Sequence, residues 1–370
     1  MKNSRDKYSV SGFENCLGRL AAGCPGWWQW LGNRETRFYA EELGGRRIDR
    51  PVFITGLARS GTTLILECLA AQGQTATHRY RDYPFLHTPV WWNRFLDRAG
   101  SEDNRAVERF HGDRILITSQ SPEAMEEILW MSFFPDCHSP GISHVFEAGD
   151  NYPSFEEFYR DHIRKILFLR EGERYVSKAN YHITRLGYLR RLLPGARFII
   201  PVRSPVSHIA SLWRQHRHFC GREKNDPRIL NYMRRTGHFE FGLDRRPVNT
   251  GNPETVNRVS QLWEAGREVP GLTLLWRSVY QYLADLLARD GELREAVLPV
   301  SYEGLCRSPE KTLTRIYDHC ELAVSPQTIA DQAAQISEPD YYACPWSERE
   351  ADRIDMETRE VYDRVLSLAV

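Results

Sequence analysis

The residues from Gly56 to Thr63 have the types and spacing of an anion-binding turn. The segment GLARSGTT contains two glycines five positions apart, an arginine between them, and hydroxyl side chains at its end. It follows the apolar run Val52 to Ile54 and precedes a stretch with helical spacing, so backbone amides and a helix N-terminus would face an anion. Arg59 would add a full positive charge. The chemistry that this turn predicts is binding of a phosphate or a similar group.

The turn differs from the phosphate loop of ATP- and GTP-dependent enzymes. That loop needs a lysine directly before its final Ser or Thr, and Thr62 stands at that position here. The strand predicted at 197–202 is followed by Arg203, where a nucleotidase would carry an aspartate for Mg²⁺. Both differences argue against transfer of a γ-phosphoryl group.

A second candidate site follows that strand. Ser204 is a natural N-cap and Pro205 fits the first helical position, which puts Ser211 two turns into a helix. An arginine at a strand end and a hydroxyl eight residues later can hold one phosphate, because the guanidinium offers a forked pair of donors. The plain alternative is a surface arginine beside a helix cap.

Together these motifs resemble those of sulfotransferases that use 3′-phosphoadenosine 5′-phosphosulfate (PAPS), nearest to the tyrosylprotein and bacterial enzymes. The resemblance covers residues 50 to 330 approximately. It implies that the turn holds the 5′-phosphosulfate and that the second site holds the 3′-phosphate. The implied cofactor-binding residues are Arg59, Ser60, Gly61, Thr62, Thr63, Arg203, Ser211 and Tyr302.

The resemblance also implies which side chains assist the transfer. Lys178 stands at the family's distance before the strand that ends near Arg203, where a lysine contacts the bridging oxygen of the phosphosulfate. With Arg59, it would neutralise charge on the transferring group and on the leaving phosphate. Because cationic side chains take this role, no metal ion is expected. One position departs from the tyrosylprotein enzymes, which carry a further arginine where this chain has Gln215.

The general base is open between several residues. Asp82 lies at about the distance past the turn where tyrosylprotein sulfotransferases have a catalytic carboxylate, and it fits equally well as a cap or as a partner of Arg79 or Arg81. Histidines are alternatives, because imidazole titrates near neutral pH. They are His78, His87 and those of the loop from His138 to His144.

The predicted fold class is α/β, a P-loop-type parallel β-sheet flanked by helices on both faces, as in the sulfotransferase fold. Buried strands are expected at 52–54, 197–202 and 297–302, and Lys178 is expected just before a helix over 181–193. Ligands of such sheets bind at the carboxyl ends of the strands.

Residues 49–370 are expected to form a single sulfotransferase domain, with residues 1–48 as a helical extension packed on it. The segment 216–257 is basic and then rich in Gly, Asn and Pro, which is typical of a mobile lid or of a plain surface insertion. His216, His218 and Cys220 within it lack the partner pair that would complete a zinc site.

The extension contains Trp27, Trp28 and Trp30, which could fill a helix seam or contact a membrane surface. Membrane anchors usually combine aromatic with basic residues. The mixed signs of the neighbouring charges therefore favour packing. These charges are Arg34, Glu35, Arg37, Glu41 and Glu42.

The composition is that of a globular protein without an overall electrostatic field. Charged residues make up 26%, aromatic residues 12%, and the formal net charge is zero, which gives no reason to expect nucleic acid as a partner. Eight cysteines without CxxC pairs, no membrane-spanning run and no signal peptide predict a reduced, cytoplasmic protein.

The sequence thus predicts transfer of a sulfuryl group from PAPS to a hydroxyl or amine, with Asp82 as base and 3′-phosphoadenosine 5′-phosphate (PAP) as product. The acceptor is open between carbohydrate, lipid, small metabolite and protein tyrosine. Two alternatives remain, a P-loop phosphotransferase or kinase and a non-catalytic PAP-binding protein. The oligomeric state is also open, a homodimer being one alternative.

Overall fold

A five-stranded parallel sheet forms the centre of the computed structural model, which describes residues 10–100, 105–109, 116–337 and 345–368. The strand order is β2-β5-β1-β6-β7. The bounds are β1 (Val52–Ile54), β2 (Thr75–Ala76), β5 (Arg174–Lys178), β6 (Arg197–Val202) and β7 (Val297–Ser301). A separate antiparallel pair is formed by β3 (Val107–Glu108) and β4 (Leu116–Ile117).

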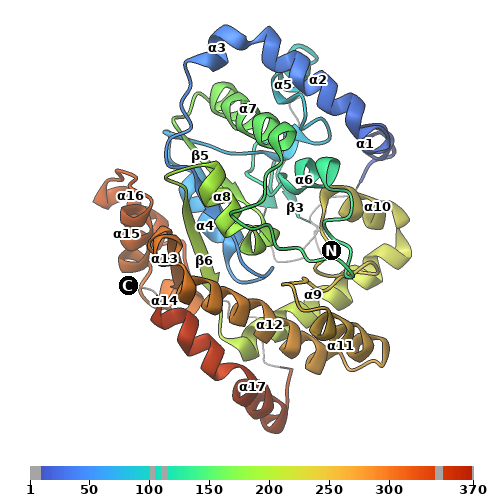
Figure 1. Ribbon diagram of the computed structural model, residues 1–370, viewed down its shortest axis with the longest axis vertical. Coiled ribbons are helices and arrows are strands. Elements are labelled where there is room, and N and C mark those ends of the chain that lie inside the picture. The colour runs from blue at the N-terminus through green and yellow to red at the C-terminus, as the bar shows by residue number, and fades with distance from the viewer. Residues whose placement is uncertain (1–9, 101–104, 110–115, 338–344, 369–370) are drawn as a thin grey trace, which may run out of the picture.

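Successive side chains of the strands enter two different apolar cores, because they point to opposite faces of the sheet. Phe53 and Phe198 belong to one core, and Val52 and Ile199 to the other. The first core is covered by α7 (Pro153–Arg170), α8 (Leu186–Leu192), α12 (Glu268–Arg289) and α17 (Glu348–Ser367). The second is covered by α4 (Thr62–Ala70), α15 (Pro309–His319) and α16 (Pro326–Ala333). Figure 1 shows this layering and confirms the predicted α/β fold with helices on both faces.

The remaining helices surround this core. They are α1 (Gly12–Gly23), α2 (Pro25–Phe38), α3 (Ala40–Gly44), α5 (Pro89–Arg98), α6 (Glu127–Phe133), α9 (Pro205–Asn225), α10 (Pro227–Thr236), α11 (Pro253–Glu264), α13 (Gly291–Ala296) and α14 (Tyr302–Arg307). None of the helices in the described ranges combines the length and apolar character needed to cross a bilayer.

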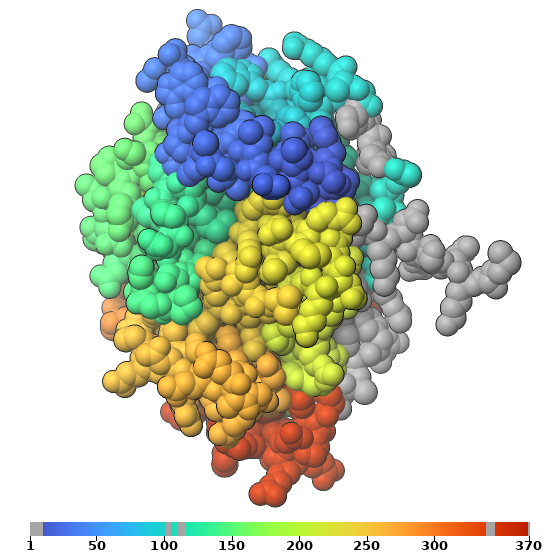
Figure 2. Space-filling model, turned by 90° about the vertical axis from the view of Figure 1, so that its right-hand side faces the viewer, coloured from blue at the N-terminus to red at the C-terminus, as the bar shows by residue number. Residues whose placement is uncertain are grey.

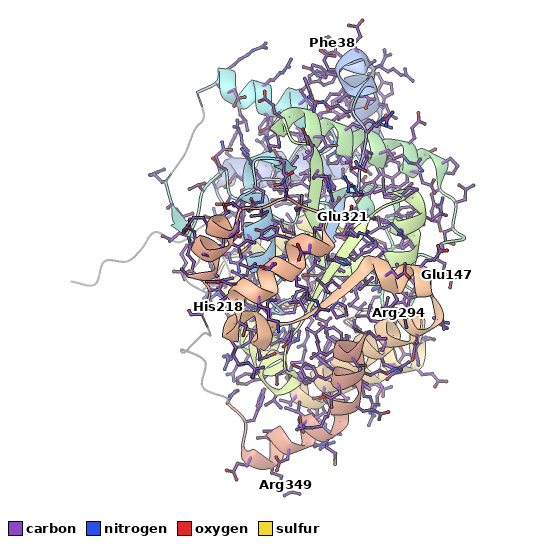
Figure 3. All side chains as sticks on the ribbon, turned by 90° about the vertical axis from the view of Figure 1, so that its left-hand side faces the viewer. Phe38, Glu147, His218, Arg294, Glu321 and Arg349 are labelled. Atoms are coloured by element: carbon purple, nitrogen blue, oxygen red, sulfur yellow. The ribbon has the colours of Figure 1, made fainter. Side chains whose placement is uncertain are left out.

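The helices α1, α2, α3 and α5 form one end of the molecule and α17 forms the other (Figures 1 and 2). Phe38 on α2 and Arg349 on α17 mark these two ends (Figure 3). The N-terminal helices α2 and α3 pack on α7, and Lys165 of α7 forms a buried ion pair with Glu35, with 3.2 Å between Nζ and Oε2.

Two local features differ from the sequence predictions. Lys178 ends the strand β5 (Arg174–Lys178), which the sequence analysis did not predict. The helix expected over 181–193 is divided into a short 3₁₀ turn, η2 (Asn180–Thr184), and α8.

The segment 216–257 is largely helical, since it contains the end of α9, all of α10 and the start of α11. Its side chains Phe219, Tyr232 and Phe241 belong to the first core. Asp226 and residues 237–252 lie outside these helices. Movement of this segment over the site stays a prediction.

Candidate active site

Four neighbouring strands bring the predicted site residues to one edge of the sheet. The anion-binding turn follows β1, and Lys178 is the last residue of β5. Arg203 directly follows β6, and Tyr302 directly follows β7. Because all these strands are parallel, the four positions meet at the carboxyl edge, where open α/β sheets bind ligands.

The backbone of the turn has a left-handed conformation at three positions. Gly56 has φ +139°, Gly61 has φ +108° and Arg59 has φ +71°. A Cβ atom at Gly61 would lie 2.7 Å from Cδ2 of Tyr302, so the site requires glycine there. A left-handed arginine is uncommon, and such strain is found at ligand sites. It directs Arg59 towards α9, where its Nε donates to Ser211 Oγ at 3.4 Å.

The turn has the donors that a bound anion needs. Gly61 is the N-cap of α4, so the amides of the first turn, including those of Thr62 and Thr63, have no acceptor within the helix. The Ser60 side chain is fully buried, and its Oγ has no hydrogen-bond partner among the described residues. A buried hydroxyl without a partner is costly, so this observation fits a phosphate group in the cradle.

Arg203 and Ser211 form the second part of the site. Both side chains are buried, and within the described ranges Arg203 Nε has no hydrogen-bond partner. The Arg203 guanidinium lies over the Tyr302 ring, 4.9 Å from its centroid. Glu303 accepts a hydrogen bond from the Ser204 amide at 2.8 Å, which fixes the start of α9. Gln215 is buried in the same helix.

His208 joins the two parts of the site. Its Nε2 donates to the Ala58 carbonyl oxygen at 2.8 Å, and its Nδ1 accepts from Trp276 Nε1 at 3.1 Å. Burial lowers the pKa of His208 to about 3, so the imidazole is neutral and keeps this arrangement. The anion-binding turn is thereby fixed to α9.

Lys178 lies at the centre of a group of charged side chains. Burial lowers the pKa of Lys178. The carboxylates of Glu123 and Glu240 raise this pKa, and the guanidinium groups of Arg109 and Arg59 lower it further. Among the described residues, the Lys178 ammonium forms no hydrogen bond. Arg109, which the sequence did not predict for the site, approaches Thr63 with 3.5 Å between Nη1 and Oγ1.

Glu123 is a carboxylate of this group that the sequence analysis missed. Burial raises its pKa, but Lys178 and Arg109 outweigh burial, and the net shift is downwards. The Glu123 carboxylate also accepts hydrogen bonds from the Tyr80 hydroxyl and from the Ala124 amide, the latter at 2.7 Å. It is therefore ionised at neutral pH and remains partly exposed.

A family model described as the sulfotransferase family matches residues 51–237, half of the chain. The chain belongs to the sulfotransferase family. Its fold is similar to that of sulfotransferase STF9 from Mycobacterium avium, with a TM-score of 0.53 and 14% identity over 96% of this chain and 87% of that chain. Sulfotransferase STF1 from Mycobacterium tuberculosis H37Rv gives a TM-score of 0.48 and 17% identity over 88% and 80%. The comparison with curated proteins gave no significant match.

In this sulfotransferase, Asp82 has a different environment from that expected of a base. Its side chain has no exposed surface. It pairs with Arg170 at 2.5 Å and accepts hydrogen bonds from the Arg79 amide and Asn93 Nδ2, both at 2.8 Å. Burial raises the pKa of Asp82, and Arg170 more than offsets this, so the carboxylate stays ionised inside the protein. This geometry argues against Asp82 as the base and supports the capping alternative, although the paired cation is Arg170.

The histidine alternatives are also buried. His78 contacts His162, with 2.8 Å between the two Nε2 atoms, and burial lowers the pKa of both. His87 contacts Ser132 Oγ at 3.0 Å, and burial lowers its pKa to about 4. His138 bonds to Glu127. None of these imidazoles is placed to reach an acceptor in solvent.

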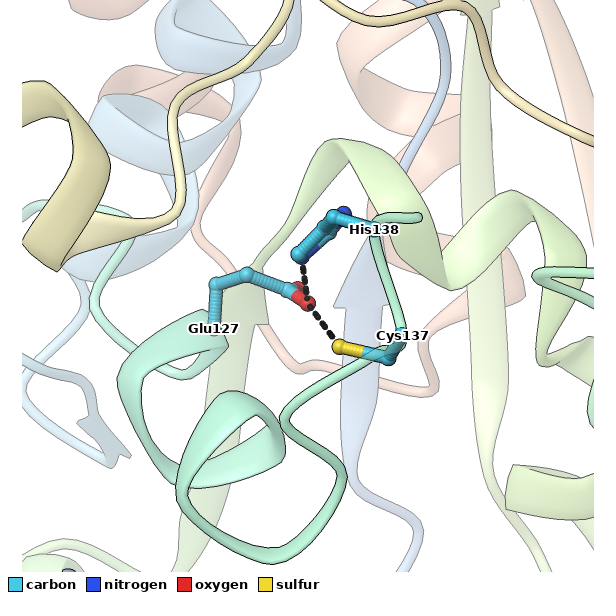
Figure 4. Close-up of side chains that lie close together, drawn as sticks. All are labelled: Glu127, Cys137 and His138. Carbon is cyan, nitrogen blue, oxygen red and sulfur yellow. Dashed lines mark hydrogen bonds and ion pairs between the residues drawn. The ribbon is translucent and has the colours of Figure 1, made fainter. Parts of the chain in front are cut away.

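Glu127, Cys137 and His138 are close enough together to bind a metal (Figure 4). Arg185, however, donates to both oxygens of Glu127, at 2.9 and 2.7 Å. A guanidinium in that position supplies the positive charge that a metal would bring, so the group is a buried ion-pair network.

His216 and Cys220, two of the residues considered for zinc in the sequence, contact each other on α9, with 3.6 Å between Nε2 and Sγ.

Proposed function

We propose that this sulfotransferase transfers a sulfuryl group from PAPS to a hydroxyl or amine of an acceptor. The observation that carries the proposal is the meeting of two anion-binding motifs at one sheet edge, joined by the contact from Arg59 to Ser211. PAPS carries a phosphosulfate on the 5′ carbon of its ribose and a phosphate on the 3′ carbon. ATP has no 3′-phosphate, so it would use only one of the two anion-binding motifs. Two separate buried donors without partners in the described structure, Ser60 Oγ and Arg203 Nε, fit such a ligand.

The residues divide between the two ends of the cofactor. The turn amides with Ser60, Gly61, Thr62 and Thr63 would hold the 5′-phosphosulfate. Arg203 and Ser211 would hold the 3′-phosphate, with Tyr302 packed against both Gly61 and Arg203. PAPS, when bound, supplies an activated sulfuryl group whose sulfur–oxygen bond to the phosphate breaks in the reaction.

Three cations surround the place where charge develops. Arg59 and Arg109 each lower the pKa of Lys178, so both positive charges lie near its ammonium. As the acceptor oxygen or nitrogen bonds to sulfur, these side chains would stabilise the negative charge that passes to the leaving phosphate. No step of this scheme requires a metal ion.

Glu123 is the base that the geometry supports in place of Asp82. It is ionised, partly exposed and adjacent to Lys178. A bound anionic cofactor would offset the charges of Lys178 and Arg109, which would raise the pKa of Glu123 towards the range useful for accepting a proton. His238, which lies 3.6 Å from Glu240 and acts electrostatically on Glu123, is the second candidate.

Transfer of label from ³⁵S-PAPS tests the proposal. A panel of sugars, lipids, small phenols and tyrosine peptides would be incubated with wild-type protein and with Lys178→Ala. Labelled product that depends on Lys178 supports the proposed reaction. PAP binding without turnover on any acceptor would favour the non-catalytic alternative, and transfer of phosphate from ATP–Mg²⁺ would favour the kinase alternative.

A further inference from the structure

One end of the molecule carries most of its exposed apolar side chains. In the part of the chain that the structure describes, eleven large apolar residues are exposed, and six of them lie on α1, α2 and α5. These helices are neighbours at the end of the molecule opposite α17 (Figures 1 and 2). The six residues are Phe13, Leu20, Trp27, Trp30, Phe38 and Phe95.

On α2 the exposed residues form a stripe. Trp27, Trp30, Arg34 and Phe38 are separated by three or four positions, which places them on one side of the helix. Trp27 is 54% exposed and Trp30 is 51% exposed, whereas Trp28 on the packed side is 7% exposed. The Arg34 guanidinium lies over the Trp30 ring, 5.1 Å from its centroid. Phe38 projects at the extreme end of the molecule (Figure 3).

The helix α5 continues this surface and is fixed to α2. A chain of aromatic contacts joins the two helices. The Phe85 ring lies 4.7 Å from the Trp28 ring and 4.7 Å from the Trp92 ring, measured between centroids. The Trp92 ring in turn lies 5.6 Å from the ring of the exposed Phe95. The Trp91 amide also donates to Glu35 of α2 at 2.6 Å. The exposed side chains therefore stand on one rigid surface.

The charges of this surface differ from what the sequence suggested. Glu35 is fully buried against Lys165, and Asp97 pairs with Arg81, so neither adds free negative charge. Among the described residues of α1, α2, α3 and α5, the exposed carboxylates without an ion-pair partner are Glu41 and Glu42, both on α3. Five exposed arginines have no carboxylate partner among the described residues. They are Arg19, Arg34, Arg37, Arg94 and Arg98.

We infer that the exposed face of α1, α2 and α5 is a docking surface for an anionic lipid bilayer. Tryptophan and phenylalanine side chains enter the headgroup region, and arginines attract anionic lipid. A second copy of the chain fits less well, because a two-fold interface would place the arginines of one copy against those of the other. The inference does not rest on the proposed reaction.

Co-sedimentation with vesicles tests this inference. The wild-type protein is expected to bind vesicles of phosphatidylcholine with 30% phosphatidylglycerol, and to bind pure phosphatidylcholine at least about tenfold more weakly. Trp27→Ser with Trp30→Ser should reduce binding to the anionic vesicles by about tenfold or more, and Arg34→Glu with Arg37→Glu should remove the preference for phosphatidylglycerol. Unchanged thermal unfolding would show that these variants are folded.

Matched controls come from the opposite end of the molecule. Met356 is 79% exposed on α17, and Arg349 is exposed on the same helix. Met356→Ser and Arg349→Glu should leave vesicle binding unchanged. The inference is overturned if wild-type protein binds neither kind of vesicle, or if the control variants lose as much binding as the tryptophan variant. A dimer that Trp27→Ser with Trp30→Ser converts to monomer, without vesicle binding, would identify an interface between two copies and also overturn it.

Discussion

Two polar regions beside the same sheet use similar residues for different purposes. In the interior, Glu127 accepts hydrogen bonds from Arg185 and His138, and Glu126 accepts from Tyr159 at 2.7 Å, from Tyr175 and from His182. Every carboxylate oxygen of this pair has a partner inside the protein. We call these residues around Glu126 and Glu127 the buried network.

At the carboxyl edge of the sheet, some buried donors and cations have no such partner. Ser60 Oγ and Arg203 Nε are buried without hydrogen-bond partners in the described part of the chain, and Lys178 lies near two other cations. Two carboxylates, Glu123 and Glu240, act on Lys178 electrostatically, but no hydrogen bond joins either of them to its ammonium among the described residues. The comparison teaches that residue type does not distinguish a structural ion-pair network from a ligand site, whereas the pairing of the buried cations does: Arg185 pairs with Glu127, and among the described residues Arg203 and Lys178 form no ion pair.

The largest expected effect concerns Glu123. Glu123→Gln should leave the fold and PAP binding intact and reduce turnover by about 10²–10⁴-fold, because the amide cannot accept the acceptor proton. Single-turnover kinetics with ³⁵S-PAPS would measure this. Asp82→Asn is the matched variant, and it should lower stability through the loss of charge beside Arg170. Near wild-type turnover in Glu123→Gln, with an inactive but folded Asp82→Asn, would return the role of base to Asp82.

Removing one member of the buried network should affect stability instead. Arg185→Met leaves Glu127 buried without its guanidinium, which should lower the free energy of unfolding by about 3–5 kcal/mol. Urea denaturation followed by circular dichroism would measure it. A loss below about 1 kcal/mol would show that the network is not the structural element described here.

Gly61→Ala should affect both the fold and the site. A side chain at φ +108° is strained, and its Cβ would meet Tyr302 at 2.7 Å, so we expect a destabilisation of about 1–3 kcal/mol together with loss of PAP binding. Gly44→Ala is the control, because a Cβ there meets nothing within 4 Å. Tight PAP binding by Gly61→Ala would contradict the close packing of the cradle.

Acid should destabilise the fold through two buried, neutral histidines, His208 at the carboxyl edge of the sheet and His87 beside Ser132. Burial lowers the pKa of His208 to about 3 and that of His87 to about 4, so protons bind the unfolded chain more readily than the folded one. Their contribution to stability is complete above the unfolded pKa of about 6.5 and is lost as the pH falls below it, by on the order of 1–2 kcal/mol for each group at pH 5. Chemical denaturation at pH 7, 6 and 5 would measure this. Stability that rises on acidification would contradict the burial of these groups.

The sequence predicted the elements whose signals are local. The strands β1 and β6 are apolar runs followed by a glycine turn and by Ser-Pro, and both lie where the pattern places them. The strand β5 was missed because RYVSK has a charged residue at each end. Arg174 is tolerated there since its guanidinium donates to the carbonyl oxygens of Arg50 and Cys320, which are distant in sequence.

The motif residues of the proposed cofactor site were predicted from spacing, and the structure brings them to one edge of the sheet. The residues that sequence reasoning missed, or whose surroundings it did not predict, depend on tertiary contacts. Asp82 pairs with Arg170, and Glu35 pairs with Lys165, through contacts that no local pattern contains. Glu123 and Arg109 carry no motif, and only the folded chain places them beside Lys178.

Calorimetric titration of PAP against adenosine 5′-monophosphate tests the central claim most directly, because the two ligands differ only by the 3′-phosphate. If Arg203 and Ser211 bind that group, wild-type protein should bind PAP about ten- to a hundredfold more tightly, as expected for a charge-assisted contact of about 1.5–3 kcal/mol. In Arg203→Ala the two affinities should become nearly equal. Equal affinities in the wild-type protein would contradict the assignment of the second anion site, and with it the reading of this sheet edge as a PAPS site.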